Sequence, residues 1–231
     1  MSYLNINKLK ISTKENTLVD ISFNIKTSTA LVGESGSGKS LTLKSILQLL
    51  PSNLNVNIDY QSDFELLRKN IAFIPQNPFT SLSPMTKIKK HFFCSDERTK
   101  EVLKLVDLDE SVLNKFPNQL SGGQIQRIVI AIAISEDVKL LLLDEPTTAL
   151  DLQNRDNIIN LIRNLHKNLD LLILFVTHDI DSISSLCDEI VIINKGSIIE
   201  TGNTKDILDN PNDDYTKRLI NSTFSNKNYR E

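Results

Sequence analysis

Residues 29–40 decide the fold, and they read Thr-Ala-Leu-Val-Gly-Glu-Ser-Gly-Ser-Gly-Lys-Ser. The apolar residues 29–32 have the character of a short buried strand, and they run directly into the pattern G-x-x-x-x-G-K-S. Residues 41–50 follow with helical apolar spacing and stop at Pro51. A strand, a glycine-rich loop and a helix in this order are typical of a cradle for phosphate groups.

Each residue type in this loop has a physical task. Glycines let the chain curl so that successive backbone N–H groups point inward at phosphate oxygens. The helix that starts near Gly38 adds the positive end of its dipole. We expect Lys39 to reach the β- and γ-phosphates and the Ser40 hydroxyl to ligate Mg²⁺. The predicted nucleotide-binding residues here are Gly33, Glu34, Ser35, Gly36, Ser37, Gly38, Lys39, Ser40 and Leu41.

Composition places this loop in an ordinary globular chain that is short of glycine. Only 7 of the 231 residues are glycine, about 3% of the chain, whereas about 7% is usual in globular proteins. Lys and Arg number 26 against 29 Asp and Glu, a balance that does not suggest a nucleic-acid binder. Cys94 and Cys187 fit neither a disulfide framework nor metal-ligand spacing, which indicates reduced thiols. Apolar runs are strand-length, far below the roughly 20 residues that span a bilayer, and no signal-peptide pattern opens the chain.

A second half of a nucleotide site lies at residues 140–145, Leu-Leu-Leu-Leu-Asp-Glu. An apolar strand that ends in an acid places Asp144 beside the phosphate loop, where it can hold Mg²⁺ through water. The next acid, Glu145, can polarise a water in line with the γ-phosphate. Such a strand end is common by itself. Paired with the phosphate loop, it predicts a nucleotide hydrolase.

Apolar segments without alternation predict a mainly parallel sheet covered by helices on both faces. At the N-terminus, residues 4–11 and 18–25 alternate apolar and polar side chains around a turn near residues 14–16, which predicts an antiparallel flank. Further strands are expected at residues 71–74, 138–143 and 171–176, with helices at 151–168 and 181–186 and a hairpin over 189–200.

The fold class expected from this pattern is α/β, in one domain over residues 1–231. Prolines break residues 77–135 into short segments between two core strands, which predicts an inserted helical subdomain. The remaining chain divides into a nucleotide-binding core with its β flank at 1–76 and 136–202, and a C-terminal helix and tail at 203–231.

The stretch Leu120-Ser-Gly-Gly-Gln124 narrows the family. With it, the chain resembles the ATP-binding subunits of ABC transporters, whose signature this is. Gln76 matches the glutamine of the family's Q-loop, residues 149–151 its D-loop and residues 177–179 its switch histidine. The resemblance covers about residues 3–220. It implies a P-loop NTPase core of the RecA-like type, with ATP and Mg²⁺ as cofactors.

The signature has the properties of half a phosphate site. Ser121, Gly122 and Gly123 precede a predicted helix, and a hydroxyl, small residues and a helix N-terminus together attract an anion. This segment has no lysine and no magnesium-binding acid of its own. The resemblance implies that it closes over an ATP held by a second subunit, with Gln124 and Asp151 also in the binding surface. Two subunits then sandwich two ATP molecules, and hydrolysis opens the sandwich.

Catalytic roles follow from the resemblance, and each has a plainer alternative. Glu145 is expected to act as the base, and His178 to contact the γ-phosphate and the attacking water. Gln76 is expected to sense the γ-phosphate and Mg²⁺. Alternatively, His178 is an ordinary residue at a strand end, Gln76 caps a strand, and Asp151 is a helix N-cap. The predicted catalytic residues are Glu145, His178 and Gln76, and the predicted metal ligands are Ser40, Gln76 and Asp144.

The adenine-binding position departs from the family pattern. The family usually stacks the base on an aromatic residue of the N-terminal strands. The matching position in this chain is Ile11, and Tyr3 is the only nearby alternative. We therefore predict weaker adenine stacking and reduced discrimination between ATP and GTP, and a competition assay that showed strict ATP preference would count against this.

Two further stretches resemble one subfamily, the oligopeptide, dipeptide and nickel importers. Residues 76–84 match the segment after its Q-loop, and residues 210–219 match its C-terminal pattern, in which Pro and a Tyr-Thr pair precede Leu. The resemblance implies an importer ATPase for peptides, nickel or a metal chelate. An exporter ATPase and a soluble ABC ATPase outside transport are the alternatives.

Partners follow from the same resemblance. It implies a homodimer or a heterodimer with a second ABC ATPase, two transmembrane permease subunits and, indirectly, an extracytoplasmic solute-binding protein, with no nucleic acid. The expected location is the cytoplasmic face of the cell membrane, as a peripheral subunit. Permease contact is expected within residues 76–93, through an apolar groove, although these side chains could instead pack the helical subdomain: Phe79, Leu82, Met85, Phe92 and Phe93.

Overall fold

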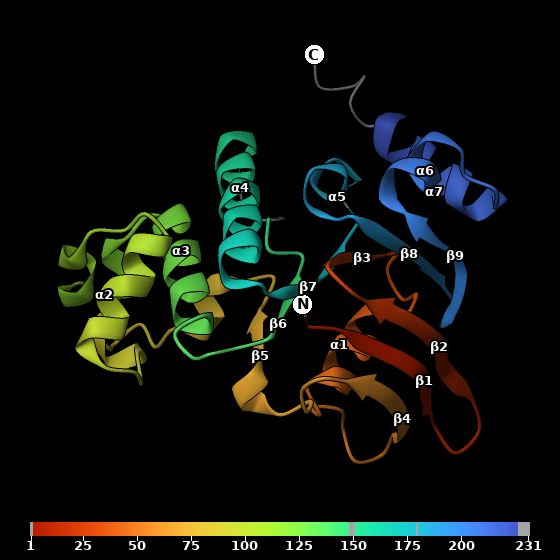
Figure 1. Cartoon of the computed structure of the whole chain (residues 1–231), viewed down its shortest axis with the longest axis horizontal. Coiled ribbons are helices and arrows are strands. Elements are labelled where there is room, and N and C mark those ends of the chain that lie inside the picture. Colours follow the sequence, from red (N-terminus) through yellow and green to blue (C-terminus); the bar gives the residue numbers. More distant parts are fainter. Residues whose placement is uncertain (1, 148–150, 179, 226–231) are drawn as a thin grey trace. The chain divides into compact units, whose positions relative to one another are not determined.

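The computed structural model describes residues 2–147, 151–178 and 180–225 (Figure 1). The chain divides into two compact units. The first unit consists of Met1–Leu67 and Leu172–Glu231, and the second consists of Arg68–Leu171. The prediction of a single domain, with its boundaries at 76, 135 and 202, stays a prediction.

An antiparallel sheet forms the N-terminal part of the first unit. Its strands lie in the order β2-β1-β4, with β1 at Leu4–Ser12, β2 at Thr17–Ile25 and β4 at Asn55–Ser62 (Figure 1). The two strands of the predicted flank are confirmed, because alternate residues of both are buried. The third strand, β4, was not predicted. Its residues Val56, Ile58 and Tyr60 alternate with polar ones, which is typical of a strand, although none of its residues is fully buried.

A second sheet of the first unit carries the phosphate loop. Its central strand is β3 (Ser28–Val32), whose five residues are all buried. It pairs in parallel with β7 (Leu172–Thr177) on one side and β8 (Glu189–Asn194) on the other. The predicted hairpin is confirmed, since β9 (Ser197–Asn203) pairs antiparallel with β8. The helices of this unit are α1 (Lys39–Ile46), α5 (Ile180–Leu186), α6 (Thr204–Asp209) and α7 (Asp214–Ser225).

The second unit contains the parallel pair β5 (Ile71–Ile74) and β6 (Leu140–Asp144) together with three of the helices that the structure describes. Helices joined by short 3-10 turns include those of residues 77–135, and the inserted helical subdomain stays a prediction. The helices are α2 (Asp96–Leu105), α3 (Gly122–Ala133) and α4 (Leu152–Leu169), and the turns are η1 (Arg68–Asn70), η2 (Pro78–Ser81), η3 (Ile88–His91), η4 (Glu110–Asn114) and η5 (Pro117–Gln119).

Two arginines join α2 to α3, which lie side by side (Figure 1). Arg127 of α3 donates to the carbonyl of Val106 at 2.7 Å, just beyond α2. Arg98 of α2 donates to the carbonyls of Ile134 and Ser135 at 3.1 and 3.2 Å. These bonds satisfy carbonyls that a helix end leaves without partners, so the pair behaves as one packed element. Within the described part of the chain, no helix is long and apolar enough to cross a membrane.

Candidate functional site

The phosphate loop connects β3 to α1 within the first unit. Gly36 and Gly38 have φ angles of 81° and 115°, in the left-handed region that favours glycine. Gly33 has a different constraint, because a Cβ at this position would collide with the carbonyl oxygen of Ile193. At Gly38 a Cβ would also come within 2.9 Å of Cγ2 of Val19. The backbone conformation and the close packing of the loop therefore both require these glycines.

Lys39 is bonded to the loop that it closes. Its side chain is buried, and its Nζ donates to the carbonyl oxygens of Gly33 at 2.6 Å and Glu34 at 2.9 Å. Burying an ammonium group is costly unless it is hydrogen-bonded, and these two carbonyls supply that compensation. The positive charge is thus fixed over the start of the loop, at the N-terminus of α1, which itself favours an anion.

Two other elements of the first unit support the loop. At the β8–β9 turn, the Gly196 N–H donates to the Ser37 carbonyl at 2.8 Å. From α7, the Tyr215 hydroxyl accepts the Glu34 N–H at 3.0 Å. Sequence analysis assigned Tyr215 only to a subfamily pattern and missed this contact. The only sequence signal was the Tyr-Thr pair itself, which does not indicate what the tyrosine touches.

The second unit brings Gln76 and Glu145 together. Gln76 follows β5 and Glu145 follows the neighbouring strand β6, so both lie at the same end of a parallel pair. Gln76 Nε2 donates to Glu145 Oε2 at 3.2 Å. Glu145 has a φ angle of 46°, which is costly for a residue with a side chain and is often found at functional positions. Asp144, the last residue of β6, is half-buried beside it.

The signature begins α3 and lies against the start of α4. Ser121 is the N-cap of α3, and its hydroxyl accepts the Gln124 N–H at 3.3 Å while Gln124 Oε1 accepts the Ser121 N–H at 3.1 Å. Among the described residues, no atom lies within 4 Å of a Cβ built at Gly122. At Gly123 the nearest atom to such a Cβ is Asn154 Oδ1, at 3.3 Å. At the start of α3, Gly123 therefore packs against Asn154, whereas Gly122 faces open space.

Asp151 does act as an N-cap, for α4. Its Oδ1 accepts the backbone N–H of Asn154 at 2.9 Å, and its Oδ2 accepts the Asn154 side-chain amide at 2.7 Å. The other residues of the predicted D-loop, Ala149 and Leu150, lie outside the described residues. His178 follows β7 in the first unit and is exposed, and its predicted neighbour Asp179 also lies outside the described residues.

Comparison with known proteins identifies the family of this chain. The family model described as "ABC transporter" matches residues 18–148, more than half of the chain. This chain belongs to the ABC transporter family. As an ATPase of that family, it binds ATP and hydrolyses it, which confirms the resemblance and the α/β P-loop fold predicted from the sequence.

Curated relatives of this ABC ATPase are named for peptide transport. The dipeptide transport ATP-binding protein DppD of Caldanaerobacter subterraneus subsp. tengcongensis is 38% identical over 85% of this chain and 69% of its own length. The oligopeptide transport ATP-binding protein OppD of Bacillus subtilis is 36% identical over 84% of this chain and 62% of its own length. The chain therefore spans about two thirds of the length of these relatives.

Solved structures of ABC proteins share the fold. The protein cbiO1 of Clostridium perfringens, part of the transporter complex cbiONQ, superposes with a TM-score of 0.78 at 25% identity and covers 98% of this chain and 97% of its own. The ATP-binding cassette MJ0796, a dimer in a post-hydrolysis state bound to ADP and Pi, gives a TM-score of 0.68 at 28% identity, and the match covers 88% of this chain and 99% of that one.

The two residues named for the adenine position in this ABC ATPase, Ile11 and Tyr3, lie toward opposite ends of β1. Ile11 is completely buried within that strand. Ile11 pairs with Val19, the residue that Gly38 approaches, so this end of β1 is the one near the phosphate loop. Tyr3 precedes the opposite end of the nine-residue strand, roughly 25 Å away at about 3.3 Å per residue.

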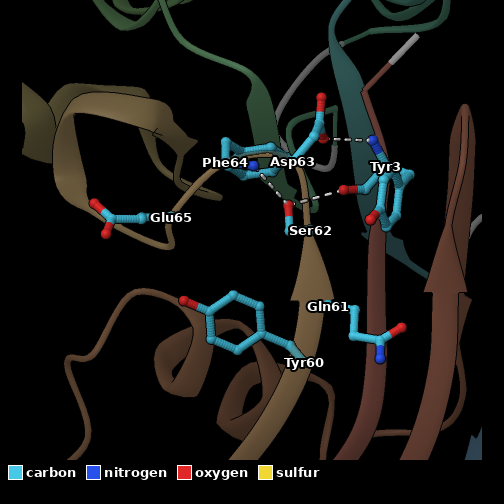
Figure 2. A pocket seen from close by; sticks show the side chains of 7 residues that line it. All are labelled: Tyr3, Tyr60, Gln61, Ser62, Asp63, Phe64 and Glu65. Carbon is cyan, nitrogen blue, oxygen red and sulfur yellow. Dashed lines mark hydrogen bonds between the residues drawn. The ribbon is translucent and has the colours of Figure 1, made fainter.

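Tyr3 belongs instead to an open hollow of about 500 Å³ beside β4 (Figure 2). The Tyr3 N–H donates to Asp63 Oδ1 at 2.9 Å, and the Tyr3 carbonyl accepts from the Ser62 hydroxyl at 2.8 Å. The N–H bond is the main reason that the pKa of Asp63 is lowered. These bonds join the start of β1 to the end of β4, and the prediction of weaker adenine stacking stays a prediction.

The chemistry of the predicted metal ligands suits Mg²⁺. Ser40 is exposed in the first unit, and Gln76 and Asp144 lie together in the second. All three offer oxygen donors, which are the ligands that Mg²⁺ prefers. Within the described residues, no group of three or more His, Cys, Asp or Glu side chains could hold a metal ion. A few oxygen ligands fit an ion that keeps several waters and binds together with nucleotide phosphates.

Proposed function

We propose that this chain is the ATP-hydrolysing subunit of an ABC importer, which couples ATP-driven closure of a dimer to the uptake of peptides. One observation carries the proposal: proteins named for dipeptide and oligopeptide transport match 84–85% of the chain at 36–38% identity. Nickel or a metal chelate is the second cargo class, because residues 76–84 and 210–219 resemble the subfamily that also imports nickel.

Binding of ATP rests on the phosphate loop. Its curled backbone presents N–H groups, and the buried Lys39 ammonium supplies positive charge at a fixed position. The dipole of α1 adds to the attraction for phosphate. Because the loop is already ordered by its own bonds, little conformational entropy is lost when the phosphates enter. The loop residues 33–40 and Leu41 thus form the proposed binding surface for the ATP phosphates.

Hydrolysis rests on Glu145 as the group that accepts a proton from the attacking water. The bond from Gln76 orients the Glu145 carboxylate. His178 contacts the γ-phosphate and the same water. When bound, Mg²⁺ neutralises phosphate charge, and Ser40, Gln76 and Asp144 would hold it.

Turnover requires a second subunit in this proposal. The signature offers the Ser121 hydroxyl, the open position at Gly122 and the positive end of α3, together with Gln124 and, at the neighbouring helix start, Asp151. A γ-phosphate held by the partner would fill this half-site. The dimer is a homodimer or a pair with a related ATPase, and the dimeric state of MJ0796 supports this arrangement.

A permease would contact the exposed apolar side chains of the second unit. Phe79, Met85 and Phe93 are 52%, 86% and 88% exposed, whereas Leu82 and Phe92 are buried. Of the five residues of the predicted groove, only Phe79, Met85 and Phe93 are therefore available for contact with a permease helix. In this proposal the subunit lies at the cytoplasmic face of the membrane, bound to two permeases, with a solute-binding protein on the far side.

Two experiments test the function in sequence. The chain is expressed with its candidate permeases, and we expect all of them to purify as one complex. Membrane vesicles carrying that complex should then take up a labelled dipeptide when ATP is on the subunit's side. If the vesicles took up Ni²⁺ and no dipeptide, the cargo would be a metal ion and not a peptide. Transport in the opposite direction, or purification without any permease, would contradict the importer and favour an exporter or a soluble ATPase respectively.

A further inference from the structure

The tyrosine in the C-terminal pattern contacts the phosphate loop directly. Tyr215 lies in the first turn of α7 and is only 7% exposed. Its hydroxyl accepts the N–H of Glu34, the second residue of the phosphate loop, at 3.0 Å across 181 residues of sequence. The Gly33 carbonyl, which belongs to the same peptide group as the Glu34 N–H, accepts from Lys39 Nζ at 2.6 Å. The peptide group between Gly33 and Glu34 is thus held from both sides, by a tyrosine and by the lysine of the loop.

The start of α7 is itself anchored, so this tyrosine has a fixed position. Glu200 on β9 accepts the backbone N–H groups of Asn212 at 3.0 Å and Asp213 at 3.3 Å. The Tyr215 N–H donates to Asp213 Oδ1 at 2.7 Å. Leu219, one turn further along α7, is buried. Strand β9 therefore holds the N-terminus of α7, and α7 holds the Tyr215 hydroxyl against the loop.

We propose that Tyr215 is a positioning residue for the phosphate loop: its hydroxyl orders the peptide group between Gly33 and Glu34 and, through it, the Lys39 ammonium before ATP binds. The inference rests on the proposed role of residues 33–40 in binding the ATP phosphates. Tyr215 does not touch the nucleotide in this scheme. Its contribution is to lower the ordering cost of binding, because a peptide with its N–H and its C=O both bonded has few alternative orientations.

The variant Tyr215→Phe removes the hydroxyl and keeps the ring in its buried position. We expect KM and Kd for ATP to rise by about 3-fold to 10-fold, the range of one hydrogen bond. We expect kcat to change less than 2-fold, because bound phosphates hold the loop in the same geometry in both proteins. We also expect the Glu34 amide to exchange with solvent faster in the nucleotide-free variant, as measured by hydrogen exchange.

A second tyrosine of the same unit provides a matched control. The Tyr60 hydroxyl accepts the Leu66 N–H at 3.4 Å beside β4, in the hollow drawn in Figure 2. The variant Tyr60→Phe therefore also removes one hydroxyl that accepts one backbone N–H, away from the phosphate loop. We expect it to leave KM, Kd and Glu34 exchange unchanged. Unchanged values in Tyr215→Phe, or equal changes in both variants, would overturn the positioning role.

The variant Lys39→Ala separates this inference from the proposed site. If Lys39→Ala loses ATP binding and Tyr215→Phe binds like the unmodified protein, the loop is the site and only the role of Tyr215 fails. If Lys39→Ala still binds ATP with unchanged affinity, the assignment of the loop fails, and the inference fails with it. All variants are measured in the full chain by equilibrium binding of a fluorescent ATP analogue and by steady-state ATPase assays.

Discussion

The phosphate loop and the signature are both glycine-containing turns at a helix N-terminus, yet they are built differently. At the loop, Gly33 lies against the Ile193 carbonyl, and Lys39 bonds the loop's own backbone. At the signature, the side chains of Ser121 and Gln124 each accept the other's backbone N–H, and a Cβ at Gly122 would meet no atom of the described residues within 4 Å. The loop is thus complete within one chain, whereas the signature presents an open surface.

This difference indicates which steps one subunit can perform alone. A preordered loop binds ATP without a partner, because the cost of ordering it was met during folding. A helix N-terminus with an open glycine contributes binding free energy only when a second surface covers it. In the proposed function, ATP binding is therefore a property of one chain, and hydrolysis is a property of two. The experiments below test that division.

The largest expected effect is on hydrolysis. Replacing Glu145 by Gln removes the proposed proton acceptor and keeps the shape of the side chain that faces Gln76. We expect ATPase activity to fall by about 10²-fold to 10⁴-fold, the usual contribution of a general base, with ATP still bound and a dimer accumulating on size-exclusion chromatography. Hydrolysis near the rate of the unmodified protein would show that Glu145 is not the base.

Loss of the lysine is expected to act one step earlier, on binding. Lys39→Ala removes the buried ammonium and its bonds to Gly33 and Glu34. We expect the affinity for ATP to fall by about 100-fold, since two charge-assisted bonds and a phosphate contact are lost. Isothermal titration of the single subunit measures it. A dimer that still formed with ATP in Lys39→Ala would break the proposed order of events.

Paired glycine substitutions test the comparison itself. In Gly33→Ala, the new Cβ collides with the Ile193 carbonyl, so we expect about 1–3 kcal/mol of lost stability and loss of ATP binding by the monomer. In Gly122→Ala, we expect stability within about 0.5 kcal/mol and unchanged monomer affinity, but at least about 10-fold weaker dimerisation when combined with Glu145→Gln. Equal effects of the two alanines on monomer binding would contradict the division between loop and signature.

Local patterns predicted the loop, the apolar strands and the signature, because each of these is a contiguous stretch of sequence. The strand β4 was not predicted, although Val56, Ile58 and Tyr60 alternate with polar residues, because this alternation is short and none of the residues of this edge strand is fully buried. Local patterns placed the first helix at 41–50, whereas α1 ends at Ile46 and Gln48 takes a left-handed conformation. The bond between Tyr215 and Glu34 joins residues 181 apart, so only the folded chain brings them together.

The smallest expected effect concerns the anchor of α7. Burial favours a raised pKa for Glu200, but the hydrogen bonds from Asn212 and Asp213 outweigh burial and lower that pKa below its ordinary value of 4.5. A carboxylate whose pKa is lower in the folded protein adds stability above the pKa of the unfolded chain. That stability is lost as pH falls through the folded value.

The variant Glu200→Gln should therefore be less stable than the unmodified protein by a few tenths of a kcal/mol at pH 7, the size of a partly screened charge at a helix N-terminus. Because the carboxyl becomes protonated in acid, the difference should shrink as pH falls below 4.5. Urea unfolding of both proteins at neutral and acid pH measures it. A difference that stayed constant with pH would mean that Glu200 acts through its shape alone, and that its charge plays no part in holding α7 and Tyr215 against the phosphate loop.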